Sequence, residues 1–183
     1  MTIYCSHFMT RYGSGSVYAT DLGVVKVEIP DLSRYQAPAD RISPELGSSS
    51  LTALTAQMLL RYFQGECIDF ADIPVFLDAM TPFRQNVLNA TRLLKYGEIS
   101  TYGQIACECA SPRAARAVGG ALASNPVPIV IPCHRVVASD GRLTGFSAPG
   151  SLNTKMLLLK MEGAEFKGLL VAKKSMVMHR KSG

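Results

Sequence analysis

The sequence predicts an α+β fold, with a small antiparallel sheet in the first half of the chain and mostly helices in the second. Two patterns indicate this fold. Short runs that alternate apolar and polar side chains occur before residue 30, whereas apolar residues recur at helical spacing after residue 80. The 183 residues, of which 48% are hydrophobic and 18% charged, suffice for one large domain or two small ones with ordinary cores.

Residues 1–80 are predicted to form an αβ domain that begins with strands. Strands are expected over residues 3–9, 16–20 and 24–29. The turn Asp21-Leu22-Gly23 precedes the third strand, so neighbouring strands would pair antiparallel.

A long loop and a helix are expected to complete this domain. Residues 31–50 contain several prolines, glycines and serines and are predicted to be a polar loop. A helix is predicted over residues 51–63, and Gly65 ends it. Residues 73–80 are expected to be a linker or a last strand, which places the domain boundary near residue 80.

Residues 81–166 are predicted to form a second, mostly helical domain. Thr81-Pro82 is expected to cap a helix that continues to Tyr96-Gly97. Thr101 and Gln104 form a capping box that opens a short helix. The first of these helices would bury one apolar face, made of Phe83, Val87, Leu88, Thr91 and Leu94.

Another helix is expected to open at Ser111-Pro112 after a tight turn. Its core face would be Ala114, Ala117, Val118, Ala121 and Leu122, with Arg113, Arg116 and Gly120 outside. Two short helices joined in this way are a candidate helix-turn-helix, and the small residues Ala115 and Gly119 would let a phosphodiester backbone come close. The alternative is a helix whose alanines and glycines pack tightly on other helices.

Charge is distributed unevenly along the chain, whose net charge is +5. Residues 1–80 carry five Lys/Arg and nine Asp/Glu (−4), residues 81–166 nine and five (+4), and residues 167–183 five and none (+5). A nucleic acid, if it is the partner, is therefore expected to dock on residues 81–166. The alternative is a charge pattern that only keeps the protein soluble. Residues 167–183 would be a basic tail or an added strand through Leu169-Leu170-Val171.

The cysteines and the apolar runs predict the location of the protein. Five cysteines at irregular spacing favour reduced thiols over a disulfide framework. The first residues lack a basic region followed by a long apolar run, and no apolar stretch approaches the ~20 residues that span a bilayer. A cytoplasmic protein, or a nuclear one in a eukaryote, is expected, with no membrane partner.

A reactive thiol is expected at Cys133, which follows the apolar run 129–131 directly after a proline. Pro132 fixes the backbone before the thiol, and His134 and Arg135 place a titratable ring and a guanidinium behind it. The alternative is a packed small hydrophobe, because consecutive side chains in an extended segment point to opposite sides.

The last helix is expected to begin with Ser151 as its cap, after a loop over residues 143–150, and to end at Glu162-Gly163. Leu152, Met156 and Leu159 would hold it to the core. The helix dipole disfavours a carboxylate in the final turn. Glu162 would therefore face solvent or meet an ion or a hydrogen-bond partner from elsewhere in the chain.

Five motifs, in this order, closely resemble the O6-alkylguanine-DNA alkyltransferases over about residues 80–166. They are Tyr102-Gly103, the segment 113–119, Asn125-Pro126, the segment 131–136 and the helix end Glu162-Gly163. The resemblance implies an RNase H-like N-terminal domain and a winged-helix-like helix-turn-helix in the second domain. It also implies that an alkyl group passes from O6 of guanine in double-stranded DNA to the protein's own cysteine, with O4-alkylthymine as a further candidate substrate.

The resemblance assigns chemical roles to five residues. Cys133 would accept the alkyl group, His134 would take the thiol proton through a bridging water, and Glu162 would orient the imidazole. A base is needed because a free thiol of pKa ~8.5 is mostly protonated at neutral pH. Asn125 would hold the active-site backbone, and Tyr102 would donate a proton near N3 of the departing guanine. From the residues alone, a plain turn asparagine and a half-buried interface tyrosine are the alternatives.

Further residues are implied to hold the substrate and the DNA. Ser147 would contact O6, and Arg116 would fill the stack after the damaged base flips out. Arg113 would contact a phosphate, and Arg135 would be a structural ion-pair partner. The remaining members of the predicted binding set are Ala115, Gly119 and Val136.

The reaction would consume the cysteine, because a thioether has no easy leaving group, and it would need no cofactor and no metal. Some members of the family hold zinc in the N-terminal domain with two cysteines and two histidines. This chain has Cys5 and His7 there but no second cysteine before Cys67, and its third histidine is His179, so no metal site is predicted. The pocket loop also differs. Ala148-Pro149-Gly150 stands where the family commonly has two glycines, which stiffens the wall and changes the range of alkyl groups accepted.

Two other classes of protein are alternatives to this reaction. A non-catalytic alkyltransferase-like protein binds damaged DNA but lacks the acceptor cysteine, and Cys133 argues against it. A transcription regulator with the same helix-turn-helix would need an effector site or a dimerisation helix, and the sequence indicates neither. A monomer is expected.

Overall fold

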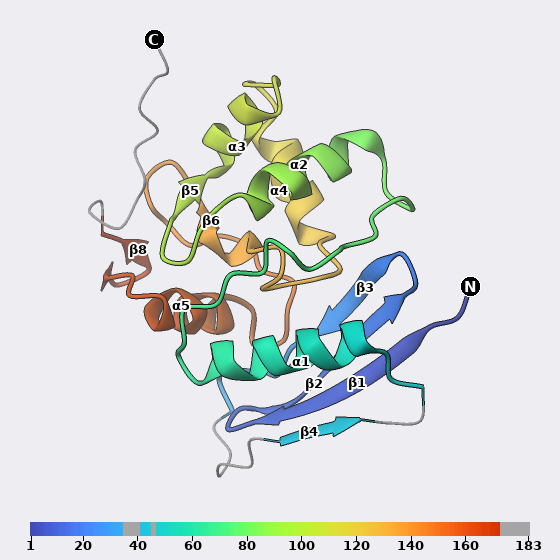
Figure 1. The fold of residues 1–183 in the computed structure, drawn as a ribbon. Helices are drawn as coiled ribbons and strands as arrows, with labels where there is room; N and C mark the ends of the chain where they lie inside the picture. The colour runs from blue at the N-terminus through green and yellow to red at the C-terminus, as the bar shows by residue number, and fades with distance from the viewer. Residues whose placement is uncertain (35–40, 45–46, 173–183) are drawn as a thin grey trace.

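The computed structural model of the protein describes residues 1–34, 41–44 and 47–172. Figure 1 shows a sheet covered by one long helix in the first half of the chain and several short helices in the second half. The expected mixture of a small antiparallel sheet and helices is confirmed.

The sheet has four antiparallel strands in the order β3-β2-β1-β4. They are β1 (Tyr4–Thr10), β2 (Gly13–Thr20), β3 (Gly23–Glu28) and β4 (Arg41–Pro44). The first three confirm the predicted strands. The prediction of an unbroken loop over residues 31–50 is wrong, because β4 lies within it. This strand has only four residues, too few for an alternating pattern to show.

The segment before the second half of the chain completes the edge of this sheet. The Val24 amide donates to the Pro74 carbonyl at 2.8 Å, and the Phe76 amide donates to the Val24 carbonyl at 3.0 Å. Gly23 has a φ of +150°, and a Cβ there would lie 2.9 Å from the Pro74 oxygen. The turn therefore requires glycine at this position.

Helix α1 (Ser50–Phe63) confirms the helix predicted over residues 51–63. Ser49 and Thr52 form a capping box that satisfies its first amides. Its buried face packs on the sheet, and the same apolar cluster continues into the second half of the chain through Val130, Ile131 and Leu158. The end of α1 is thereby held against the region of Cys133.

Four helices make up most of the second half: α2 (Pro82–Arg92), α3 (Tyr102–Glu108), α4 (Ala115–Ala123) and α5 (Ser151–Met161). Between them, β5 (Ser100–Thr101) pairs in parallel with β6 (Val136–Val137). The predicted capping box of α3 is present, with the Gln104 amide donating to Oγ1 of Thr101 at 3.2 Å. Thr81 occupies the N-cap of α2, without a side-chain hydrogen bond.

Two helix boundaries differ from those predicted. Helix α2 ends at Arg92 instead of continuing to Tyr96, and a turn leads from it to Gly97, whose φ is +78°. Helix α4 begins at Ala115 and not at Ser111, because residues 111–114 form a tight turn. Ala117, expected on its core face, is exposed.

The turn between α3 and α4 has a specific cause. Ala110 adopts a φ of +52°, the Ala110 amide donates to the Cys107 carbonyl, and the Ser111 amide donates to the Ala106 carbonyl. These bonds form a Schellman motif, which ends α3 and reverses the chain. Alanine here takes the left-handed conformation that glycine usually supplies.

The start of α5 and the end of the described chain also differ in detail from the expectation. Gly150, with a φ of +76°, occupies the N-cap of α5, so Ser151 is its first residue and not its cap. Strands β7 (Phe166–Lys167) and β8 (Leu170–Val171) form a hairpin, which confirms the added strand. The Leu143 amide donates to the Leu169 carbonyl, so this hairpin packs on the rest of the second half. Residues 173–183 of the predicted basic tail lie outside the described residues.

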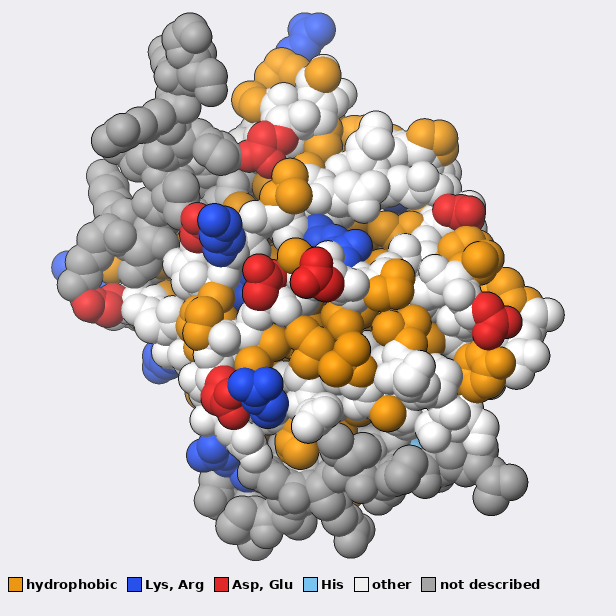
Figure 2. All heavy atoms as spheres, in the orientation of Figure 1, with side chains coloured by type: hydrophobic (Ala, Val, Ile, Leu, Met, Phe, Trp, Pro, Cys, Tyr) orange, Lys and Arg blue, Asp and Glu red, His pale blue; other side chains and the backbone are white. Residues whose placement is uncertain are grey.

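Surface charge is mixed on the face seen in Figure 2, where acidic and basic side chains lie side by side around an apolar middle. Ion pairs such as Arg61 with Glu66 neutralise part of the surface charge of the described residues. The described residues of this face therefore form no continuous basic surface of the kind that binds a DNA backbone.

Candidate active site around Cys133

The chain presents Cys133 at the start of a 3-10 turn, Cys133–Arg135, and not in an extended segment as expected. The Arg135 amide donates to the Pro132 carbonyl at 2.9 Å, which closes the turn. Successive side chains in such a turn diverge by about 120°. Cys133 is 6% exposed and His134 is fully buried. Cys133 thus keeps a small exposed fraction, whereas His134 has none.

Asn125 holds both the backbone and the sulfur of this turn. Its Nδ2 donates to the Ile131 carbonyl at 2.9 Å and to Sγ of Cys133 at 3.1 Å, while its Oδ1 accepts from the Val127 amide. Burial raises the pKa of the Cys133 thiol, and the hydrogen bond from Asn125 and the charge of Lys155 act against this rise. Both groups favour the thiolate, the form of cysteine that attacks carbon.

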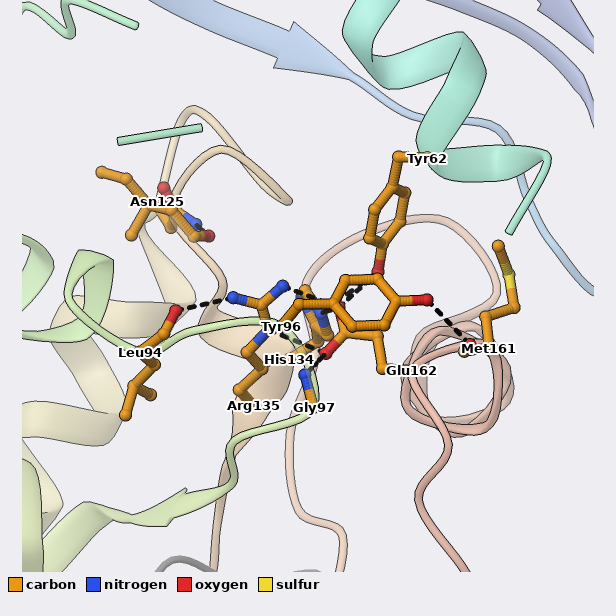
Figure 3. A network of polar contacts seen from close by, with 10 residues as sticks. Tyr62, Leu94, Tyr96, Gly97, Asn125, His134, Arg135, Met161 and Glu162 are labelled. Atoms are coloured by element: carbon orange, nitrogen blue, oxygen red, sulfur yellow. Dashed lines mark hydrogen bonds and ion pairs between the residues drawn. The ribbon is translucent and has the colours of Figure 1, made fainter. Parts of the chain in front are cut away.

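His134, Arg135 and Glu162 form a buried polar network, which Figure 3 shows from close by. Nε2 of His134 lies 2.8 Å from Oε1 of Glu162. Arg135 donates from Nε to Oε2 at 2.8 Å and from Nη2 to Oε1 at 2.9 Å, and the Gly97 amide donates to Oε2 at 3.2 Å. The partner from elsewhere in the chain, which was one of the two expectations for Glu162, is therefore His134 together with Arg135.

The network fixes the charge of each member. Burial by itself would raise the pKa of Glu162, but the hydrogen bonds and charges of His134 and Arg135 hold it well below its usual range. Burial lowers the pKa of His134, which the neighbouring Glu162 only partly offsets. The structure thus favours an ionised carboxylate beside a neutral imidazole.

One nitrogen of His134 is left basic by this arrangement. Because an ionised carboxylate can only accept, Nε2 must carry the hydrogen that lies between it and Glu162. Nδ1 then has a free lone pair, and among the described residues it has no hydrogen-bond partner although it is buried. An imidazole held in this way can accept a proton at Nδ1.

Tyr62 is a member of the network that the sequence did not reveal. Its hydroxyl donates to Oε1 of Glu162 at 2.7 Å and lies 3.4 Å from Nε2 of His134, and the side chain is fully buried. It comes from the last turn of α1, about a hundred residues from Glu162 along the chain. A tyrosine on the apolar face of a helix gives no sequence signal for such a contact.

Lys155 is a second residue that sequence reasoning missed. It is 1% exposed, and its Nζ donates to the carbonyls of Val136 at 2.7 Å and Thr144 at 3.1 Å. Burial lowers its pKa to about 8, against the opposing influence of Cys133. A signal was present in the sequence, because Lys155 lies three residues after Leu152 and three before Leu158, on the face of α5 that packs inward.

Cys133 forms part of the wall of a cavity of about 830 Å³ between α3, α4 and the loop after β6. Five of the predicted residues line it, namely Tyr102, Ala115, Arg116, Gly119 and Ser147. The Tyr102 hydroxyl donates to the Thr144 carbonyl at 3.3 Å and accepts from Oγ1 of Thr144 at 3.2 Å. A cavity of this size holds a molecule as large as a nucleobase.

Two predicted residues lie elsewhere. Arg113 is exposed in the turn before α4, on a separate hollow formed by residues 110–114. Val136 is fully buried in β6, and its carbonyl accepts from Lys155. Neither lines the cavity beside the thiol.

A second cavity of about 510 Å³ reaches Cys133 from the side of the sheet. Its walls are β3, the segment around Pro126 and Pro128, and the loop of residues 146–149. Phe146 and Ser147 line both cavities, so this loop stands between them with the thiol at the junction. The stiff segment Ala148-Pro149 belongs to the wall of the second cavity.

The described part of the chain holds neither a candidate metal cluster nor a membrane-spanning helix. Within it, no three His, Cys, Asp or Glu side chains lie close enough together to hold a metal ion, and His179 lies beyond it. No helix of the described ranges is long and apolar enough to cross a membrane. All five cysteines lie in the described residues, and none of them forms a disulfide.

Sequence comparisons connect this site to known proteins. Residues 82–164 match the family described as the DNA binding domain of 6-O-methylguanine DNA methyltransferase. A methylated-DNA–protein-cysteine methyltransferase of Mycobacterium bovis is 37% identical over 154 residues, which cover 84% of this chain and 85% of that protein. The protein of the same name from Haemophilus influenzae is 48% identical over 102 residues, and that match spans about half of each protein, 56% of this chain and 55% of the relative.

Solved structures give the same result for the fold. The Mycobacterium tuberculosis protein OGT, crystallised in complex with DNA, matches 88% of this chain and 92% of its own with a TM-score of 0.68 and 30% identity. The O6-methylguanine-DNA methyltransferase of Pyrococcus kodakaraensis matches 88% of this chain and 99% of its own, with a TM-score of 0.62 and 25% identity.

Proposed function

The chain belongs to the methylated-DNA–protein-cysteine methyltransferase family, and we propose that Cys133 is the residue that accepts the alkyl group from O6-alkylguanine in duplex DNA. The observation that supports this most is the place of the thiol. Cys133 carries a hydrogen bond from Asn125, stands in the wall of a cavity large enough for a base, and precedes a buried His134–Glu162 pair. This combination suits a nucleophile and a base.

The proposed reaction balances without a cofactor. Sγ of Cys133 bonds to the alkyl carbon as the bond from that carbon to O6 breaks, and the electron pair stays on guanine. His134 takes the thiol proton at Nδ1 through a bridging water, with Glu162 holding the ring. Over the whole reaction the thiol proton ends on guanine, and Cys133 ends as a thioether that cannot react again.

The groups around the cavity have separate tasks in this proposal. Tyr102 donates toward N3 of the departing base, and Ser147 contacts O6. Arg116, exposed in the first turn of α4, enters the base stack when the damaged nucleotide flips out. Asn125 keeps the turn in shape. The second cavity, which opens beside the thiol, takes alkyl groups longer than methyl, and the same site is proposed to accept O4-alkylthymine.

The DNA is proposed to bind along α3 and α4. These helices and their tight turn resemble a helix-turn-helix with a winged-helix-like surrounding, whereas the sheet and α1 resemble an RNase H-like unit. The complex of the M. tuberculosis protein with DNA supports a DNA partner. Arg113, exposed in the turn before α4, is proposed to contact a phosphate, and the nearby small residues Ala115 and Gly119 leave room for the backbone.

We also propose that the protein acts as a monomer in the cytoplasm, or in the nucleus of a eukaryote. Five cysteines without a disulfide among them suit a reducing compartment. A damage-recognition protein without chemistry is disfavoured, because it would need no thiol in the wall of the base cavity.

Intact mass spectrometry tests the proposal. The protein is incubated with a duplex that carries one O6-methylguanine, and with a matched duplex that carries guanine. We expect one added methyl group per chain with the damaged duplex only, and no further product when this duplex is in excess. An unchanged mass together with retained binding to the damaged duplex would contradict transfer and support recognition alone.

A further inference from the structure

Tyr62 joins the first half of the chain to the acid of the second half. Figure 3 shows its side chain reaching from the end of α1 toward Glu162 and His134. The ring is fully buried, and edge-on aromatic contacts with Phe63, Phe70 and Tyr96 hold it in place. The position of the hydroxyl is therefore set by packing in both halves of the protein.

The proton of this hydroxyl has one strong acceptor. Oε1 of Glu162 lies 2.7 Å from the phenol oxygen, whereas Nε2 of His134 lies 3.4 Å from it. Once the proton is donated to the carboxylate, only lone pairs of the phenol face Nε2. Both polar neighbours of Nε2 are then acceptors, so the imidazole must carry its hydrogen at Nε2 and keep Nδ1 free.

We propose that Tyr62 is a positioning residue for the alkyl transfer, which holds His134 in its Nδ1-basic form by donating to the Glu162 oxygen that His134 shares. The proposal rests on the proposed function, because it assumes that His134 acts as the base in the alkyl transfer. It also assigns the first half of the chain a part in the reaction, through Glu162.

The same hydrogen bond moderates the basicity of His134. The charged and titratable groups that face the imidazole are Glu162, Arg135, Lys155 and the phenol of Tyr62, with Cys133 beside it in the chain. A phenol that draws on the negative charge of Oε1 leaves less of that charge to stabilise an imidazolium. Removal of the hydroxyl should therefore raise the pKa of His134 and let the base become protonated at a higher pH.

The variant Tyr62→Phe tests this, with Tyr96→Phe as its matched control. The two rings lie 6.1 Å apart, centroid to centroid, in contact with each other. Both hydroxyls donate, but that of Tyr96 donates to the Met161 carbonyl at 2.9 Å and not to the carboxylate. Glu162 keeps its bonds from Arg135 and Gly97 in both variants, so both should fold.

Two readouts separate positioning from a loss of structure. The pKa of the His134 imidazole, followed by NMR, should rise by about one unit in Tyr62→Phe. The acid limb of the pH–rate profile for methyl transfer should move to higher pH by the same amount. In Tyr96→Phe neither should move. A Tyr62→Phe protein that is slower by the same factor at every pH, or that shifts no more than Tyr96→Phe, would overturn the proposal.

Replacing Tyr62 by a ring-fluorinated tyrosine keeps the shape of the side chain but should shift the pKa of His134 in the direction opposite to that of Tyr62→Phe. Its more acidic hydroxyl donates more strongly to Glu162, so the pKa of His134 should fall below that of the unmodified protein. An unchanged or raised pKa of His134 would contradict the proposed charge sharing. Wild-type protein that does not take up methyl at all would count against the proposed function, whereas these shifts in the pKa of His134 bear on Tyr62 alone.

Discussion

Arg135 binds Glu162 through two parallel hydrogen bonds, Nε to Oε2 at 2.8 Å and Nη2 to Oε1 at 2.9 Å, with both side chains buried. A third donor of the same guanidinium, Nη1, reaches the Leu94 carbonyl at 2.7 Å. The guanidinium that directly follows the candidate base thus fixes the acid and the turn after α2 together. Planar two-point contacts of this kind are geometrically specific.

Substitution of Glu162 should show how much the contact with Arg135 contributes to the free energy of unfolding. The folded-state pKa of Glu162 is depressed, so its contribution is fully present above the unfolded value of about 4.3 and is lost as the pH falls through the carboxylate range. Glu162→Gln should lower the free energy of unfolding at pH 7 by about 3–5 kcal/mol, because it leaves Arg135 buried without its counter-charge. Below pH 4 the difference from wild type should shrink.

Urea unfolding between pH 3 and pH 7 measures this, with Glu66→Gln as the control. Glu66 pairs with Arg61 at the surface, where both side chains are about half exposed, so its loss should cost less than about 1 kcal/mol. Equal losses in the two variants would show that the buried network does not carry the stability assigned to it.

Lys155 should control how easily Cys133 ionises. Its buried charge favours the thiolate, so Lys155→Met should raise the pKa of Cys133 by about one unit and slow alkylation of this thiol by iodoacetamide at pH 7 about tenfold. Lys155→Arg keeps the charge and should react much more like wild type. Mass analysis of the peptide that contains Cys133 follows the reaction, and an unchanged pH dependence in Lys155→Met would exclude this role.

Arg116 should matter only when the base must leave a stack. Arg116→Ala is expected to slow methyl transfer from duplex DNA at least tenfold while changing the reaction with free O6-methylguanine base less than about twofold, because the free base needs no flipping. Arg113→Ala is the control for a charge outside the cavity. It should weaken duplex binding and lower the salt dependence of binding by the amount expected for about one lost phosphate contact. The rate of methyl transfer from the bound duplex should change little.

Equal slowing of Arg116→Ala on the duplex and on the free base would remove the stack-filling role. The comparison is made from single-turnover rates at saturating protein, so that weaker binding does not enter.

The sequence predicted the parts of the fold that depend on local signals. The alternating strands of the first half and the Thr101–Gln104 capping box are of this kind, since each is encoded within a few residues. Helix α4 was placed too early because Pro112 also suits a turn. Strand β4 forms because β1 offers it an edge, which no local pattern records.

Some residues of the site could likewise be predicted from local motifs, whereas others depend on how the chain folds. Motifs around residues 102–162 predicted the neighbours of Cys133, and the structure brings Asn125 to its sulfur and Glu162 to His134. Tyr62 could not be foreseen, because its contact depends on how α1 packs against the second half. Lys155 could be predicted only in part. A lysine on an inward face is visible in the sequence, but its acceptors are backbone carbonyls, whose positions only the fold supplies.

The most direct test of the account locates the transferred group. The protein is reacted with a duplex whose O6-methylguanine carries a trideuterated methyl group, digested, and analysed by tandem mass spectrometry, with Cys133→Ala as the control. We predict one label per chain, all of it on Cys133, and none in Cys133→Ala. A label on Cys67, Cys107 or Cys109, or uptake by Cys133→Ala equal to that of wild type, would contradict the assignment of Cys133 as the acceptor.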